Sequence, residues 1–163
     1  MSDHLATTHW QRDATAPTAD FHAQRYSRQH RLYFDGGATV SASASPSNVL
    51  PRWADAAAVD PEELFVAALS SCHMLWFLSL AAAAGWCVDD YRDDAVGTLA
   101  RNTNGDLAMT VVLLRPAVRF NGEHRPNAGQ LQQLHHDAHR RCFIANSVTS
   151  ELRIEPVAIE AGP

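Results

Sequence analysis

The chain contains no lysine, and this absence bears on its partners. All thirteen basic residues are arginines scattered along the 163 residues, and the formal net charge is −5. A protein that binds the phosphate backbone of nucleic acid needs clustered positive charge. We therefore expect no nucleic-acid partner.

The sequence also lacks the marks of a secreted protein. Its first residues, MSDHLATTHWQRD, show neither the basic region nor the apolar run of a signal peptide. Three cysteines, an odd number, do not suit the paired framework of a small secreted domain. We expect a cytoplasmic protein, in which functional cysteines are more often catalytic or metal-binding than structural.

Repeats and low-complexity tracts are absent, and the length suits one domain, 1–163, with residues 1–24 partly flexible. The alternating runs HRLYF and ATVSASAS, separated by Asp35, Gly36 and Gly37, predict a hairpin. A short strand is predicted before it, over residues 8–12. Residues 44–59 carry two prolines and Trp53, and a connector this long either covers a site or is a plain surface loop.

A long helix has the clearest end signals in the chain. Asp60 suits the N-cap, Pro61 the first helical position, and Glu63 completes a capping box with Asp60. Gly85 suits the residue after the helix. We therefore predict a helix from Pro61 to about residue 84.

No charged residue occurs from 64 to 84, so this helix could be a membrane span or a core helix. Serines, Cys72 and His73 interrupt the apolar run, and no Lys or Arg cluster flanks it. We expect no membrane. A helix that is apolar on all sides should be buried on all sides. Because one sheet covers one face, we predict an obligate homodimer in which a second subunit covers the other.

The rest of the chain predicts an α+β fold, with an antiparallel sheet and helices on one side. Residues 91–102 and 107–120 resemble strands joined at Asn104–Gly105, a strong hairpin signal. A helix is predicted from Pro126 to residue 141, and CFIANSV (142–148) as its continuation or another helix. ELRIEPVAIE (151–160) predicts a final strand.

When each of the three cysteines is considered alone, its sequence context leads to a different prediction. Cys87 suits a small buried hydrophobic residue, and a mid-helix Cys72 would usually be one too. Cys142 is expected to begin a helix, where the positive dipole end and the neighbouring Arg140 or Arg141 would favour a thiolate.

Two motifs together resemble the OsmC/Ohr family of osmotically inducible and organic-hydroperoxide-resistance proteins. DPEELFVAALSSC (60–72) is similar to the family's first motif, in which Asn/Asp-Pro-Glu opens the central helix ten residues before the peroxidatic cysteine; these positions are Glu62 and Cys72. The second cysteine corresponds to Cys142. The similarity extends from about residue 25 to the C-terminus. Members that continue the second motif as Cys-Pro-x-Ser differ from this chain, which has Phe143 after the cysteine, and His73 is also unusual.

The resemblance implies an OsmC-like fold and a thiol peroxidase that reduces organic hydroperoxides. Cys72 would become a sulfenic acid and condense with Cys142 to a disulfide. An external dithiol, lipoyl-based in the family, would restore the pair, without a bound cofactor or metal. The family also implies an arginine beside the thiolate, held by the motif glutamate Glu62. Arg28 matches best and Arg25 second. The substrate pocket would include Trp53, Met74, Phe77 and Phe143.

The spacing of Glu62 and Cys72 leaves two arrangements open. Ten residues of straight helix span about 15 Å, which is too far for both side chains to hold one guanidinium. Either the helix breaks between them, or Glu62 serves the partner subunit's Cys72. We predict the shared site, with small residues (Ala67, Ala68 and Ser71) allowing two helices to approach.

Two other functions are also compatible with the sequence. His135, His139 and Cys142 share one helical face, next to His136, and such residues can ligate zinc. The chain could also be a dimeric redox-sensing or ligand-binding protein of the same fold that does not catalyse turnover.

Overall fold

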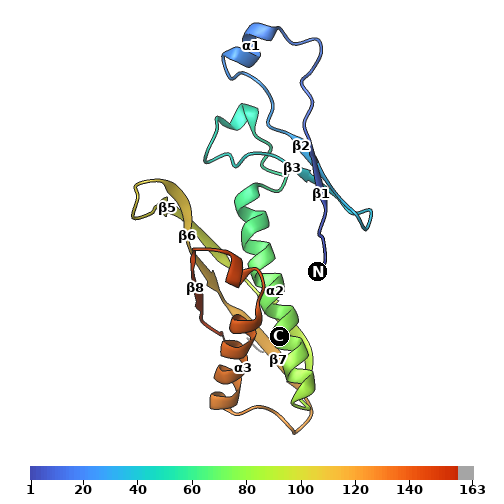
Figure 1. Cartoon of the computed structure of the whole chain (residues 1–163), viewed down its shortest axis with the longest axis vertical. Helices are drawn as coiled ribbons and strands as arrows, with labels where there is room; N and C mark the ends of the chain where they lie inside the picture. Colours follow the sequence, from blue (N-terminus) through green and yellow to red (C-terminus); the bar gives the residue numbers. More distant parts are fainter. Residues whose placement is uncertain (158–163) are drawn as a thin grey trace, which may run out of the picture. The chain divides into compact units, whose positions relative to one another are not determined.

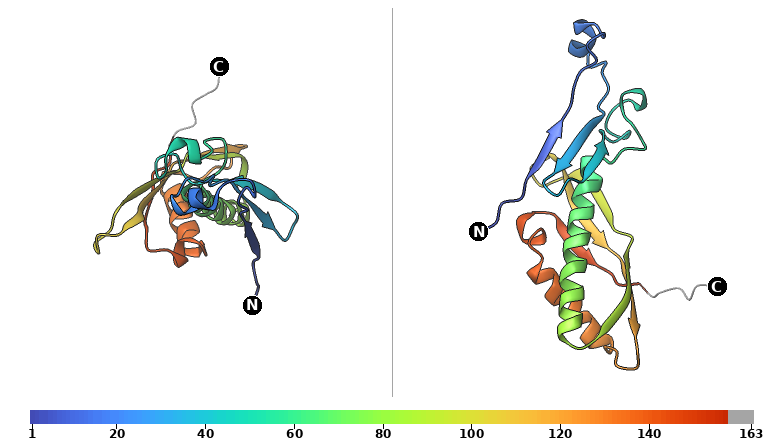
Figure 2. Two further views of the ribbon diagram at one scale, coloured as in Figure 1. Left: turned by 90° about the horizontal axis from the view of Figure 1, so that it is seen from above. Right: turned by 90° about the vertical axis from the view of Figure 1, so that its right-hand side faces the viewer.

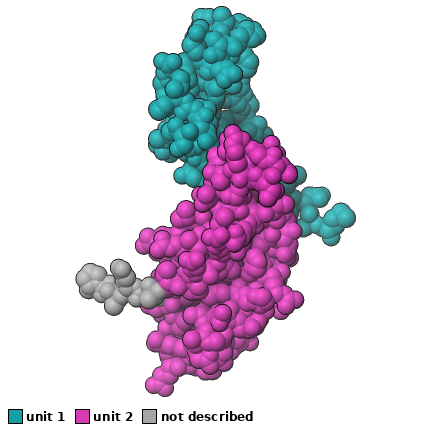
Figure 3. Space-filling model, turned by 90° about the vertical axis from the view of Figure 1, so that its left-hand side faces the viewer, with its two compact units in different colours: residues 1–64 teal, residues 65–163 magenta. Residues whose placement is uncertain are grey.

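The computed structural model describes residues 1–157 and divides into two compact units, Met1–Leu64 and a second that begins at Phe65 (Figure 3). The predicted long helix, α2 (Pro61–Ala83), begins in the last residues of unit 1.

Unit 1 is built on a three-stranded antiparallel sheet in the order β1-β2-β3 (Figure 1). The predicted hairpin is confirmed: β2 (His30–Phe34) and β3 (Thr39–Ala42) pair across a turn in which Gly37 has φ +85°. The strand predicted at 8–12 lies slightly earlier, as β1 (Ala6–His9). The connections carry a short helix α1 (Thr18–His22) and a 3₁₀ turn η1 (Pro51–Trp53).

Helix α2 begins and ends where its caps predict. The Asp60 carboxylate accepts the Glu63 backbone N–H at 2.8 Å, and the Glu63 carboxylate accepts the Asp60 N–H at 3.0 Å. This reciprocal capping box satisfies two donors at the start of the helix. Gly85, with φ +77°, allows the chain to leave the helix. Residues 61–83 therefore form one continuous helix.

Residues 1–157 cover one face of α2 and leave the other exposed. Its buried residues recur every four positions: Leu69, His73, Phe77 and Ala81. The opposite face is exposed and uncharged, formed by Ala67, Ala68, Ser71, Leu75, Ser79 and Ala82. By length and composition alone α2 could cross a membrane, a test that the core helix of a soluble protein also passes.

Unit 2 contains two small sheets, and each predicted strand run is divided between them. The sheet β4-β7 pairs Cys87–Asp93 with Pro116–Asn121; the sheet β5-β6-β8 is formed by Val96–Arg101, Leu107–Leu114 and Glu151–Ile154. Asp93 ends β4, where the first run is divided. Its carboxylate accepts the backbone N–H of Arg115, the residue at which the second run is divided, at 2.6 Å. The same carboxylate accepts the Ser70 hydroxyl at 2.5 Å. The predicted turn at Asn104–Gly105 joins β5 to β6, with φ +86° at Gly105.

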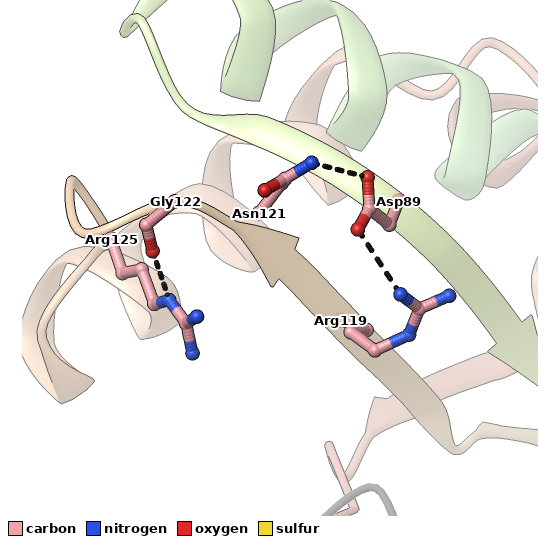
Figure 4. A network of polar contacts seen from close by, with 5 residues as sticks. All are labelled: Asp89, Arg119, Asn121, Gly122 and Arg125. Atoms are coloured by element: carbon pink, nitrogen blue, oxygen red, sulfur yellow. Dashed lines mark hydrogen bonds and ion pairs between the residues drawn. The ribbon is translucent and has the colours of Figure 1, made fainter.

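Polar contacts at one end of the β4-β7 sheet fix the two strands to each other (Figure 4). The Asp89 carboxylate accepts from Arg119 and from the Asn121 amide, both at 3.1 Å. Just beyond β7, Arg125 donates to the Gly122 carbonyl at 2.6 Å. These groups are exposed, so they position the strands more than they stabilise them.

The predicted antiparallel pairing is confirmed for the other strand pairs, and the one exception among the named strands of residues 1–157 is the parallel pair β6 and β8. A parallel pair needs a crossover connection instead of a hairpin, and here α3 lies in that connection. Strand β8 covers the first part of the predicted final strand; residues 158–160 of that prediction lie outside the described residues.

Helix α3 (Ala128–Arg141) lies along α2 within unit 2 (Figures 1 and 2). It starts slightly later than predicted, because Asn127 is its N-cap and forms a capping box with Gln130. Leu134 and Ala138 of α3 pack with Phe77 and Ala81 of α2 in a buried core cluster.

The helix predicted at 142–148 is wrong, since α3 ends at Arg141 and only the 3₁₀ turn η2 (Ala145–Ser147) follows. Cys142 has extended backbone angles (φ −66°, ψ 112°). The Ser147 hydroxyl and the Asn146 amide then donate to the carbonyls of Phe143 and Arg140. These side-chain bonds satisfy carbonyls that a continuing helix would pair with its own backbone.

Candidate active site

The packing of α3 on α2 brings two thiols into contact. Cys72 lies on α2 and is half-buried, whereas Cys142 directly follows α3 and is only 1% exposed. Their side chains are close enough for Cys72 to raise the pKa of Cys142, although about 70 residues separate them in the sequence. Both thiols are free in the structure.

The electrostatic setting of Cys142 differs from the prediction. The residue stands at the C-terminal end of α3, where the helix dipole is negative, and not at a helix start. Burial raises the pKa of the Cys142 thiol to about 11, and the neighbouring Cys72 thiol adds to the rise. The backbone N–H of Ala145, 3.3 Å from the sulfur, opposes it. Cys142 is therefore a protonated thiol at neutral pH.

Two aromatic rings lie beside the thiol pair. Trp76, one turn after Cys72 on α2, meets the Phe143 ring edge-on at 5.6 Å, and the Arg141 guanidinium lies 5.7 Å from the Trp76 ring. Phe143, predicted to line a substrate pocket, is 69% exposed. The structure thus places Phe143 next to the thiols, with Trp76 as its packing partner.

The other predicted pocket residues lie elsewhere. Phe77 is fully buried in the core and packs against His135 at 4.5 Å. Met74 is half-buried on α2. Trp53 belongs to unit 1, where its carbonyl accepts the Arg28 backbone N–H at 2.8 Å. The structure therefore brings Trp53 to Arg28 and gives Phe77 a packing role.

The two candidate arginines have different partners. Arg25 is bound to the Asp20 carboxylate at 2.6 Å. Arg28 instead lies over the Tyr26 ring, 3.5 Å from its centroid, and donates through one nitrogen to the carbonyls of Tyr26 and Gln24. Among the described residues no carboxylate forms an ion pair with Arg28.

Glu62 is only partly satisfied. Its Oε1 accepts from the Asn48 amide at 3.0 Å, whereas its buried Oε2 has no hydrogen-bond partner among residues 1–157. A buried carboxylate oxygen without a donor is costly. Glu62 and Arg28 each retain unused capacity for an opposite charge.

His73 is not an isolated core residue. Its Nε2 lies 3.1 Å from Nδ1 of His135, and the two parallel rings stack with centroids 5.4 Å apart. Burial is the main cause that lowers the pKa of both histidines to about 4. Within residues 1–157 no group of three ligands is placed to hold a metal, so the predicted zinc face gains no support.

The sequence did not predict two features of the structure. Cys87, expected to be buried, is exposed on β4. In unit 1 the rings of Trp10, Phe21 and Tyr26 form a cluster beside Arg28. Its only sequence signal was the length of the segment between the first two strands.

Comparisons with known proteins agree with this fold. A family model described as OsmC-like protein matches residues 54–157. An OsmC-like protein of unknown function from Vibrio cholerae is 48% identical, with a TM-score of 0.92 over 96% of this chain and 100% of that one.

More distant structures show the fold alone. Organic hydroperoxide resistance proteins from Legionella pneumophila and Bacillus subtilis are each 15% identical, with TM-scores of 0.66 and 0.63. The alignments cover 97% and 96% of this chain, and 97% and 98% of theirs. No curated protein matches. The resemblance predicted from the two cysteine motifs is confirmed, and the chain belongs to the OsmC-like family.

Proposed function

We propose that the protein is a cysteine-based peroxidase that reduces organic hydroperoxides through a Cys72–Cys142 disulfide. The observation that carries this proposal is the contact between the two thiols, which come from distant parts of the sequence. A merely structural cysteine needs no second thiol beside it. A peroxidase that resolves its own sulfenic acid does.

The reaction balances with these two residues and an external dithiol. The Cys72 thiolate attacks the terminal oxygen of the hydroperoxide; the O–O bond breaks, and the alkoxide takes up the proton that Cys72 lost. The Cys142 thiol then attacks the sulfenic sulfur, the S–S bond forms and water leaves. A dithiol returns two electrons and two protons to the disulfide.

Burial favours this order of attack. Cys72 is the more exposed thiol, and only a thiolate reacts with peroxide. The raised pKa of Cys142 keeps it protonated until it meets the electrophilic sulfenic acid. An exchange of roles would require the more buried thiol, whose pKa is raised, to react first.

We propose Arg28 as the cation that stabilises the Cys72 thiolate, with Glu62 orienting it. The pairing of Arg25 with Asp20 favours Arg28, which has no carboxylate partner among the described residues. Because α2 is continuous, Glu62 and Cys72 of one chain are about 15 Å apart along the helix. Glu62 would therefore act on the partner subunit's Cys72.

A shared site requires a homodimer, and the exposed face of α2 is its proposed interface. This face is uncharged, it consists mostly of small residues, and Leu75 at its middle is 61% exposed. Small residues let two helix backbones approach closely, and a single subunit leaves this apolar surface in water.

Leu75→Glu is expected to convert the dimer into monomers, because two carboxylates would meet in an apolar interface. Size-exclusion chromatography with light scattering measures the mass. Leu107→Glu is the matched control, since Leu107 is 66% exposed on β6 and is not one of the residues of α2's exposed face. A wild-type monomer, or a dimer that survives Leu75→Glu, would contradict the interface.

The function is tested by mass spectrometry of the reduced protein after one equivalent of cumene hydroperoxide. We expect a Cys72–Cys142 disulfide and repeated turnover when a dithiol is added. Failure to oxidise either thiol would refute the proposal. Oxidation without dithiol-driven turnover would instead favour a redox sensor.

A further inference from the structure

Helix α3 carries three histidines that line a cavity of unit 2. His135, His136 and His139 border it from α3, and Ile154 and Pro156 border it from β8 and the residues just after it. This cavity, defined here as the α3 cavity, measures about 470 Å³, within the size range of small-molecule sites. The histidines considered for zinc thus surround a space large enough for an organic ligand.

His135 has one ring nitrogen that residues 1–157 do not use. The residue is only 3% exposed, its Nδ1 lies 3.1 Å from Nε2 of His73, and its ring packs against Phe77 at 4.5 Å. Its Nε2, on the other side of the carbon between the two nitrogens, is buried and has no hydrogen-bond partner among these residues. Leaving such an atom unpaired is costly, so a ligand that reaches it gains a hydrogen bond without breaking one in the protein.

His139 repeats this arrangement one turn later on α3. Its Nδ1 is also buried and also lacks a hydrogen-bond partner among residues 1–157. Residues four positions apart lie on the same face of a helix. Two unpaired ring nitrogens therefore occur on the face of α3 that borders the cavity.

The protonation of these rings indicates which ligand group suits them. In a neutral imidazole one nitrogen donates and the other accepts, so the role of His135 Nε2 depends on which ring donates in the bond with His73. A hydroxyl group fits either case, because it accepts from an N–H and donates to a bare nitrogen. A carbonyl oxygen can only accept, and an ammonium group can only donate.

The charge of the α3 cavity indicates what the rest of the ligand is. Its described lining residues include no arginine, lysine or carboxylate, and burial lowers the pKa of His135 to about 4, so that this ring is neutral at neutral pH. An anion would lose its hydration there without meeting a permanent cation. Ala128, Leu131, Ile154 and Pro156 supply apolar surface. The lining therefore favours a neutral and largely apolar molecule.

We propose that the α3 cavity binds a small neutral molecule with an apolar body and one hydroxyl group, of which an alkylphenol is the simplest example. The hydroxyl bonds to His135 Nε2, and the apolar body lies against Leu131 and Ile154. No cysteine lines the cavity among the described residues. The site is therefore separate from the thiol pair, and the inference holds whether or not the protein is a peroxidase.

The ligand test compares three molecules of similar shape by nuclear magnetic resonance titration of the reduced, nitrogen-15-labelled protein at neutral pH. We expect 4-ethylphenol to shift the backbone signals of α3 and β8 and the ring nitrogen signals of His135. Ethylbenzene should bind about tenfold more weakly, because it leaves the buried nitrogen unpaired. The anion 4-ethylbenzoate should also bind at least about tenfold more weakly. Equal binding of 4-ethylphenol and ethylbenzene, or tighter binding of 4-ethylbenzoate, would overturn the proposal. No shift with millimolar 4-ethylphenol would also overturn it and leave the cavity to water.

A pair of variants tests where the ligand binds. Ala128→Phe should weaken the binding of 4-ethylphenol at least about tenfold, because the new ring occupies the α3 cavity. Ala128 is the exposed first residue of α3, so this change removes no core side chain. The matched control Gln133→Phe adds the same ring at an exposed position of α3 that does not line the cavity, and should leave binding unchanged. Binding that Ala128→Phe does not weaken would place the ligand elsewhere and refute the site.

Discussion

Replacing Cys72 with serine should reduce hydroperoxide consumption by at least about 1,000-fold, because a hydroxyl is not ionised near neutral pH and cannot replace the attacking thiolate. Cys142→Ser should behave differently. Its Cys72 should react once at the normal rate and stop as a sulfenic acid, since no second thiol is beside it. Stopped-flow peroxide assays measure the first step, and dimedone labelling detects the trapped sulfenic acid.

Cys87→Ser is the matched control for these variants. Cys87 is exposed on β4 and is not part of the thiol pair, so its loss should leave both the first step and the turnover unchanged. If Cys72→Ser consumed peroxide at the original rate, the attacking residue would be wrongly assigned. If Cys142→Ser sustained full turnover, resolution within the chain would be excluded.

The fold should lose stability in mild acid, because His73 and His135 must be neutral to remain buried together. Their folded pKa values of about 4 are below the unfolded value of 6.5. The stabilisation is therefore complete above pH 6.5, and it is lost as the pH falls from 6.5 to 4. Between pH 7 and pH 5 the two unfolded histidines bind protons whereas the folded pair stays largely neutral, so we predict a decrease of roughly 2–4 kcal/mol in the unfolding free energy.

Chemical denaturation across this pH range measures the effect. His135→Gln keeps a neutral hydrogen-bonding group beside His73 and should flatten the profile. The matched control is His136→Gln, since His136 is the exposed neighbour on α3, and it should leave the slope unchanged. Identical pH profiles for wild type and His135→Gln would show that the histidine pair does not control acid stability.

The elements that the sequence predicted well depend on local chemistry. Asp60 and Glu63 cap α2, and Gly85 and Gly105 adopt the left-handed conformations that their positions required. Such signals act within a few residues, so the chain itself carries them. The division of the strand runs at Asp93 was not predicted, because it depends on a contact with Ser70 of α2.

The motifs identified Cys72 and Cys142 as the cysteines of the site, whereas the tertiary structure determined which residues surround them. Cys142 was expected at a helix start, yet it follows the end of α3, where the Asn146 amide bonds to the Arg140 carbonyl. The pairing of His73 with His135 joins residues 62 positions apart, and no local pattern encodes it.

The sequence by itself determined the elements with local end signals, the cysteine motifs and the family. Only the tertiary structure decided the parallel pairing of β6 with β8, the contact between the thiols, and the cluster of aromatic rings beside Arg28. Caps and turns are fixed by neighbours in the chain, whereas these contacts exist only after distant segments have packed together. The free energy that selects them comes from burying side chains of several elements at once.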